Sequence, residues 1–224
     1  MNLNKHLEFF NPTEVKDEIH IIGCGAIGST VAEMLTRLGF KELYLYDFDT
    51  VSEHNITNQM FRFKDVGKPK VEALAEILTE INPDIVLHLE PEGYTEFTRL
   101  NGIVFLAVDS IELRKEIVTT LKYNKDIKYV TDCRMGLTDA QCYTADWTKE
   151  VDVERLLASM QFTSEEAKAA TPISACGTTL SVTPTVRTVV SLCVSNLINF
   201  FKTNEIKNMI IVDAFAMNIT YFPL

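Results

Sequence analysis

The sequence predicts an α/β fold with a doubly wound, mainly parallel sheet. Short β-branched segments alternate along the chain with longer segments of helical periodicity, and glycines separate the first predicted strand from the first predicted helix. Strands joined by a helical crossover pair in parallel, with the helices packed on the faces of the sheet. Two apolar runs around Asp213 have no helix between them, so we expect antiparallel strands to be added toward the C-terminus.

The predicted elements follow in chain order. The expected strands are IHIIG (19–23), ELYLYD (42–47), IVLHLE (85–90), IVFLAV (103–108), YVTDCRMG (129–136), QCYTADW (141–147) and a pair within MIIVDAFAMNITYF (209–222). The expected helices are STVAEMLTRLG (29–39), PKVEALAEILTEIN (69–82), SIELRKEIVTTLKYN (110–124) and TVRTVVSLCVSNLINFF (185–201). Gly39 is a helix stop, Pro69 occupies a tolerated first-turn position, and Ser110 is an N-cap candidate.

Length and composition bound the class of protein. The chain has 224 residues, 46% of them hydrophobic, which is enough for one substantial core, so we expect a single domain over 1–224. Within it the polar, alanine-rich stretch of about 159–176 is expected to be a mobile crossover segment. A formal charge of −10 argues against binding to nucleic acid or an acidic membrane. No signal peptide or membrane span is recognisable, so we expect a cytoplasmic protein.

Cysteine usage indicates no disulfide framework. The five cysteines are scattered and form no C-x-x-C pair, so a tetrathiolate zinc site is not indicated either. The four histidines show no ligand spacing.

A glycine-rich loop follows the first predicted strand and opens the first helix. It reads GCGAIG (23–28), a G-x-G-x-x-G pattern, and Asp47 follows Gly28 by 19 residues at the end of the next strand. In that context the glycines let the backbone approach a phosphate, the helix N-terminus offers unpaired N–H groups, and the acid accepts from ribose hydroxyls. The loop therefore predicts a Rossmann-like nucleotide site, without choosing between NAD, FAD and ATP; the alternative is a tight turn with no ligand.

Three charged residues downstream extend this prediction. Lys70 begins a helix, Asp109 ends the strand IVFLAV, and Arg114 lies one turn into the following helix. Because the ends of successive parallel strands open onto one crevice, these residues could surround a single ligand. Two cations and an acid beside a phosphate loop suit a triphosphate with Mg²⁺. Solvated helix faces and a simple helix cap are the alternatives.

Taken together, the motifs resemble the ThiF/MoeB-like adenylyltransferases of the ubiquitin-activating enzyme superfamily. They occur in order as GCGAIG, DFDTVSEHNITNQ (47–59), VGKPKVE (66–72) and VDSIELR (108–114), and the resemblance runs from about residue 18 to the C-terminus. It implies a homodimer that uses ATP and Mg²⁺. The implied reaction joins the C-terminal carboxylate of a ubiquitin-like or sulfur-carrier protein, with a Gly-Gly type end, to the α-phosphate of ATP.

The resemblance also implies roles for single residues. Lys70 and Arg114 would contact phosphates, and Asp109 would hold Mg²⁺. The residues implied to bind the nucleotide are Gly23, Gly25, Ala26, Ile27, Gly28, Asp47, Asp49, Asn55, Gln59, Arg62 and Lys70. Cys176, in a polar loop before the last long helix, is the candidate for thioester or persulfide transfer, with a packing role as the alternative.

The chain departs from the family pattern at several positions. Asn58 stands where relatives carry arginine, and Arg62 is the only nearby replacement. The N-terminal R-Y-x-R-Q-type arginine is missing. Ala145 replaces the second cysteine of a zinc-binding pair, so no zinc is expected. Two other functions stay open: an NAD-dependent Rossmann oxidoreductase, motivated by the glycine loop and Asp47, and a noncatalytic relative that binds a nucleotide or a partner.

Overall fold

An eight-stranded sheet forms the centre of the protein, with the strand order β3-β2-β1-β4-β5-β6-β7-β8. The computed structural model describes residues 1–173 and 180–222. The strands are β1 (Ile19–Ile22), β2 (Glu42–Tyr46), β3 (Val86–Glu90), β4 (Gly102–Leu106), β5 (Ile127–Met135), β6 (Asp139–Asp146), β7 (Met209–Asp213) and β8 (Asn218–Phe222). Strands β3, β2, β1, β4 and β5 pair in parallel, and β6, β7 and β8 are added antiparallel. The predicted fold class is confirmed.

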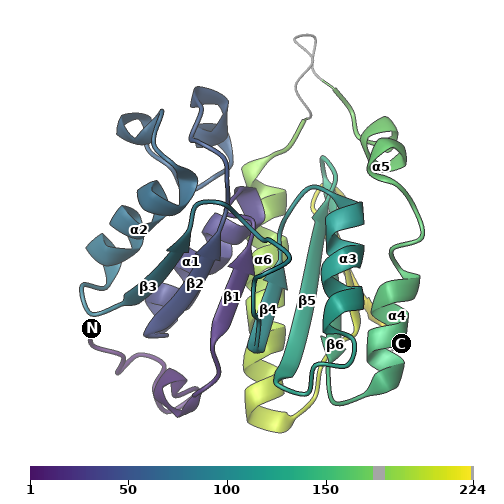
Figure 1. The fold of residues 1–224 in the computed structure, drawn as a ribbon. Helices are drawn as coiled ribbons and strands as arrows, with labels where there is room; N and C mark the ends of the chain where they lie inside the picture. The colour runs from purple at the N-terminus through teal and green to yellow at the C-terminus, as the bar shows by residue number, and fades with distance from the viewer. Residues whose placement is uncertain (174–179, 223–224) are drawn as a thin grey trace.

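Helices cover both faces of the sheet (Figure 1). They are α1 (Ala26–Leu38), α2 (Lys70–Ile81), α3 (Ile111–Leu121), α4 (Glu150–Ala158), α5 (Ser164–Ala170) and α6 (Thr183–Thr203), with short 3₁₀ helices η1 (Pro12–Glu14), η2 (Glu53–Thr57) and η3 (Phe63–Asp65). One apolar cluster joins the sheet to α1, α2 and α6, and a second joins its other face to α3 and α4. The chain therefore switches faces between β1 and β4, where α1 and α3 leave on opposite sides.

The ends of the helices follow from local chemistry. Helix α1 ends at Gly39, whose φ of +95° is left-handed and lets its N–H reach the Thr36 carbonyl (3.1 Å). Helix α3 begins as predicted, because the Ser110 hydroxyl accepts from the Leu113 N–H (3.1 Å). These caps fix where each helix starts relative to the strand ends.

Two helices were missed in the sequence. Helix α4 follows β6 where we expected no element, and α5 lies within the segment of about 159–176 that we expected to be mobile. A capping box between Thr163 and Glu166 stabilises the start of α5, although α5 has no buried residue. The mobility of the segment stays a prediction, and residues 174–176 lie outside the described part of the chain.

The apolar faces of helix α6 are buried inside the molecule. It packs on α1, β5, β6 and β7, while Ser191, Ser195 and Asn199 face solvent. The apolar character of the predicted helix 185–201 is thus accounted for by the core. Among the described residues, no helix is both long and apolar enough to cross a membrane.

Candidate functional site

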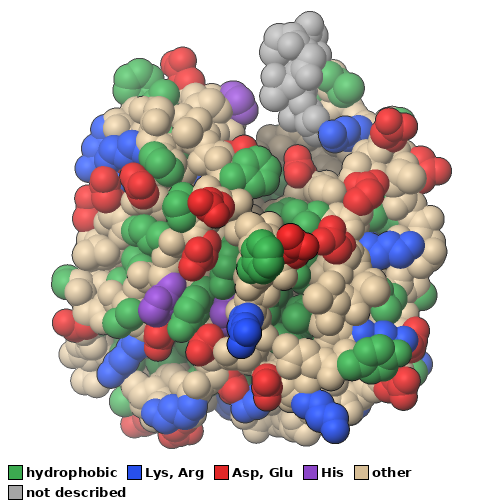
Figure 2. All heavy atoms as spheres, viewed as in Figure 1, with side chains coloured by type: hydrophobic (Ala, Val, Ile, Leu, Met, Phe, Trp, Pro, Cys, Tyr) green, Lys and Arg blue, Asp and Glu red, His purple; other side chains and the backbone are tan. Residues whose placement is uncertain are grey.

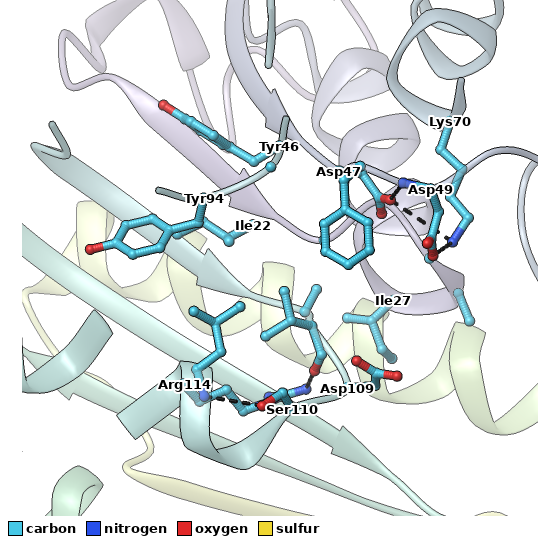
Figure 3. A pocket seen from close by; sticks show the side chains of 18 of the residues that line it. Ile22, Ile27, Tyr46, Asp47, Asp49, Lys70, Tyr94, Asp109, Ser110 and Arg114 are labelled. Carbon is cyan, nitrogen blue, oxygen red and sulfur yellow. Dashed lines mark hydrogen bonds and ion pairs between the residues drawn. The ribbon is translucent and has the colours of Figure 1, made fainter. Parts of the chain in front are cut away.

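A pocket of about 510 Å³ opens at the carboxyl ends of the parallel strands, between β1 and β4. This is the switch point of a doubly wound sheet, where such folds bind ligands. The predicted residues that line it are Gly23, Gly25, Ala26, Ile27, Asp47, Asp49, Gln59, Lys70, Asp109 and Arg114. In Figure 3 Asp49 and Lys70 lie on one side of the pocket and Asp109 and Arg114 on the other. The sequence-distant residues of the prediction thus meet in one place, while their roles stay predictions.

The N-terminus of α1 forms one wall. Gly23 has a φ of +94°, and a Cβ there would lie 2.7 Å from the backbone of Ala107, so only glycine lets the loop after β1 pass this close to the backbone that follows β4. The Ser29 N–H bonds back to the Gly25 carbonyl (3.0 Å), and the N–H groups of residues 26–28 precede the first bond of the helix. Together with the helix dipole they make this wall suitable for an anion.

Acidic and basic side chains meet opposite the loop. The Asp47 carboxylate accepts from the Cys24 N–H (2.6 Å) and the Asp49 N–H (2.9 Å), which fixes its orientation. Burial raises the pKa of Asp47, although Lys70 and these two N–H groups oppose the rise. Lys70 is 6% exposed and donates to Asp49 (2.6 Å), whose side chain is half exposed. Since Asp49 can turn to water, Lys70 can exchange this partner for a ligand at low cost.

Arg114 is held more firmly. Its Nη1 donates to Asp132 and to the Cys133 carbonyl (3.0 Å), and its Nη2 donates to the Val108 carbonyl. Burial and the neighbouring Arg134 lower the pKa of Arg114 to about 9, so it stays cationic at neutral pH. Arg114 therefore ties the ends of β4 and β5 together, and its buried Nε–H has no acceptor among the described residues.

Asp109 and Gln59 have polar atoms to spare. Asp109 is exposed, lines the pocket, and has no hydrogen bond or ion pair with the residues that the structure describes. Gln59 lines the same pocket, and its Oε1 is buried without a described donor. A hard carboxylate with no protein partner suits Mg²⁺, and an orphaned acceptor suits a hydroxyl or a metal-bound water. The residues present therefore fit a nucleotide with magnesium.

Three predicted nucleotide ligands lie outside this pocket. Gly28 stands behind the loop, where an added Cβ would lie 1.8 Å from the Gly23 carbonyl oxygen, so it allows close packing of helix and loop. The Asn55 side chain accepts from the Ser52 N–H (2.9 Å) and caps η2.

The third is Arg62, whose expected role as the replacement for the missing arginine stays a prediction, because its side chain is bonded elsewhere in this structure. It donates to Asp65 (2.9 Å) and to Glu80 (2.6 Å) on α2, because these carboxylates satisfy its charge away from the pocket. Asn58 itself donates to Ser181 (2.7 Å). Cys176 lies outside the described residues.

The structure also adds residues that the sequence analysis did not find. Phe48, which is 73% exposed, and Tyr94 line the pocket. Phe48 lies between the predicted ligands Asp47 and Asp49, so its position in the sequence could have indicated it. The loop that carries Tyr94 contains no motif that would have done so. Cys133, Cys142 and Cys193, from β5, β6 and α6, bring their sulfur atoms within 4.8 Å of one another in the core. Their packing says nothing about zinc, whose expected absence stays a prediction.

Solved structures share this fold at low sequence identity. Escherichia coli MccB with ATP superposes with a TM-score of 0.65 at 18% identity, over 92% of this chain and 63% of that one. The E. coli tRNA N6-threonylcarbamoyladenosine dehydratase TcdA superposes with a TM-score of 0.67 at 17% identity, over 90% of this chain and 94% of that one. These similarities support the fold alone.

Sequence comparison gives closer, shorter matches. The chain is 49% identical over 69 residues to ubiquitin-like modifier-activating enzyme 5 of Arabidopsis thaliana, which is 31% of this chain and 16% of that protein. It is 38% identical over 111 residues to the protein of that name in Drosophila mojavensis, covering 49% of this chain and 26% of that protein. The chain thus spans only a minor part of these relatives. The model of the ThiF family matches residues 15–224, and the chain belongs to the ThiF family.

Proposed function

We propose that this protein is an ATP-dependent adenylyltransferase that activates the C-terminal carboxylate of a ubiquitin-like or sulfur-carrier protein. One observation carries the proposal: the α1 N-terminus, Lys70 and the carboxylate of Asp109, which has no partner among the described residues, line a single pocket. A dinucleotide site needs the first of these but not the other two. Membership of the ThiF family, and relatives named ubiquitin-like modifier-activating enzyme 5, support the same class of reaction.

In this proposal each wall of the pocket has a separate task. The N–H groups at the start of α1 bind phosphate, and Asp47, already oriented by two N–H donors, accepts from the ribose. Lys70 leaves Asp49 for the phosphates. Arg114 acts as a positioning residue, since its Nη atoms are occupied by Asp132 and by backbone carbonyls.

A second cavity gives the incoming carboxylate a route. It has a volume of about 490 Å³ and shares Asp109, Arg114 and Met135 with the nucleotide pocket. Arg134 also lines it and stays cationic, because burial lowers its pKa only to about 10. Arg114 and Arg134 both donate to Asp132, so their positive charge would attract a carboxylate tail without either arginine leaving this partner. A carboxylate is ionised at pH 7, so the attack needs no general base.

Asp109 would hold Mg²⁺, which neutralises charge on the leaving pyrophosphate when bound. The carboxylate oxygen then forms the new bond to the α-phosphorus while the bond to the pyrophosphate oxygen breaks. The protein contributes position and charge, which is where catalysis of phosphoryl and nucleotidyl transfer mostly comes from.

We further propose that the Cys176 thiolate accepts the acyl group and releases AMP. Support comes from the family resemblance alone. A Cys176→Ala variant is expected to keep adenylation and to lose any conjugate that thiols cleave. An unchanged conjugate would remove the cysteine from the reaction.

A homodimer is also proposed. The β7–β8 hairpin exposes apolar side chains, including Phe215 (85%) and Met217 (91%), which a second subunit could cover. Size-exclusion chromatography with light scattering should give twice the mass of the chain. A monomer at micromolar concentration would refute the proposal.

The adenylation proposal is tested by ATP–pyrophosphate exchange with a panel of ubiquitin-like proteins that end in Gly-Gly. Exchange should depend on the tail and disappear in Asp109→Ala. The noncatalytic alternative is favoured by one observation, the Asn58 amide bonded to Ser181 where relatives have a cation. It predicts ATP binding without exchange across the whole panel.

A further inference from the structure

The side chains that line the nucleotide pocket carry more negative than positive charge. Among the described residues its lining has the carboxylates of Asp47, Asp49 and Asp109 against the cations Lys70 and Arg114. Lys70 is paired with Asp49, and Arg114 with a carboxylate in β5. Asp and Glu side chains also gather across the middle of the face shown in Figure 2. ATP brings several negative charges, and Lys70 together with the Mg²⁺ that Asp109 would hold offsets only part of them, so a further cation near the phosphates would strengthen binding.

Arg187, on the second turn of α6 (Thr183–Thr203), is a cation without a carboxylate partner in the described part of the chain. No acidic group of the described residues lies within ion-pair distance of it, and the side chain is partly buried. Its Nη1 donates to the Thr30 hydroxyl (3.2 Å), and its Nη2 contacts the Met60 sulfur (2.8 Å). A hydroxyl and a thioether are weak partners for a guanidinium. The guanidinium is partly buried and has only these two weak partners, so an anion that it can reach would stabilise its charge.

Arg187 lies near the wall of the pocket that is formed by the N-terminus of α1, where the phosphates are proposed to bind. Thr30 lies one turn beyond Ala26 and donates to its carbonyl (2.8 Å), so the guanidinium packs beside the first turn of α1. Met60 is the neighbour of Gln59, whose Nε2 lies 4.0 Å from the place where a Gly25 Cβ would stand. Arg187 therefore lies directly behind the corner where Gln59 meets the glycine loop.

The beginning of α6 is fixed at this corner. The Thr183 hydroxyl donates to the Thr57 carbonyl (2.6 Å), and Asn58 donates to Ser181 (2.7 Å). The segment that carries Gln59 is thus tied to the residues before and at the start of α6. This attachment holds Arg187, one turn further along α6, close to the segment that carries Gln59 and Met60.

We propose that Arg187 binds the β- and γ-phosphates of ATP and supplies the charge that Asn58 lacks. The inference rests on the proposed function. The guanidinium exchanges its contact with Met60 for phosphate oxygens, and Gln59, whose Oε1 has no described donor, lies beside the path it takes. Arginine suits this role because its planar fork can bind two phosphate oxygens at once.

The test compares ATP with AMP, since only ATP carries the phosphates that Arg187 would contact. Dissociation constants for both nucleotides are measured by calorimetry with Mg²⁺ on the full chain and on Arg187→Gln and Arg187→Lys. The glutamine variant should bind ATP at least about tenfold more weakly and AMP less than about twofold more weakly. The lysine variant should fall between wild type and glutamine, because it keeps the charge and loses the fork. Arg155→Gln, on α4 across the sheet and partly exposed, is the matched control and should change neither constant.

Equal weakening of ATP and AMP would overturn the proposal, because it would show that Arg187 only holds the 53–60 segment in place. Unchanged ATP affinity would overturn it as well. Failure of the proposed function looks different: wild-type protein would then bind neither nucleotide. Melting temperatures without ligand, expected to be alike, verify that the variants are folded.

Discussion

Alanine substitutions at Gly25 and Gly28 separate two uses of glycine in the same loop. In Gly28→Ala the new Cβ would lie 1.8 Å from the Gly23 carbonyl oxygen, a backbone atom that cannot turn aside. In Gly25→Ala the nearest atom is the Gln59 Nε2 at 4.0 Å, an ordinary contact. The first change therefore strains the fold, whereas the second places a methyl group in the pocket.

The magnitudes follow from these distances. Relieving the Gly28 overlap moves α1 away from the loop, and overpacking of this kind costs about 1–3 kcal/mol. The contact is with backbone, so we expect the upper end, about 3 kcal/mol, which is a fall of roughly 6–12 °C in melting temperature for a chain of this size. Gly25→Ala should change the free energy of unfolding by less than about 1 kcal/mol, yet weaken ATP binding about tenfold because its methyl occupies the phosphate wall.

Thermal unfolding without ligand and calorimetric titration with ATP measure the two effects separately. The reasoning fails if Gly28→Ala melts with the wild type. It also fails if Gly25→Ala binds ATP with unchanged affinity, because the α1 N-terminus would then not be the phosphate wall.

Two further predictions concern buried charge. Burial lowers the pKa of His20 to about 4 from 6.5, against the opposing effect of Glu18, while its Nδ1 is bonded to Tyr46 (3.0 Å). Between these pKa values the unfolded chain binds a proton that the folded chain does not, so the protein becomes less stable as the pH is lowered. From pH 7 to pH 5 the free energy of unfolding, measured in urea, should decrease by about 2 kcal/mol more for wild type than for His20→Gln. Asp132→Asn leaves Arg114 buried without its carboxylate, and chemical unfolding should show a loss of about 3–5 kcal/mol; a loss below 1 kcal/mol would contradict the role assigned to the pair.

The sequence predicted the elements whose patterning comes from burial. Strands β1 and β4 are buried throughout and read as continuous apolar runs, and α2 shows its apolar stripe. Helix α5 was missed because it has no buried residue, so no hydrophobic period marks it. Helix α4 is nine residues long and buries only Asp152, Val153 and Leu156, too few to stand out.

The residues of the candidate site also divide into those that could be predicted from the sequence and those that could not. The meeting of Lys70 and Asp109 could be foreseen, because parallel strands end at one edge of the sheet. The fate of Arg62 could not, since it depends on Glu80 one element away. Arg187 meets Met60 across 127 positions of sequence, and only the packing of α6 on α1 brings the two together.

The most direct test of the central claim is the product itself. Protein, Mg²⁺, ATP and a Gly-Gly-terminated ubiquitin-like protein are incubated and acid-quenched, and the intact mass of the ubiquitin-like protein is measured. The account predicts an AMP adduct on its C-terminal carboxylate, formed by wild type and absent with Asp109→Ala. A phosphate adduct, or an AMP adduct that forms equally well with Asp109→Ala, would contradict it.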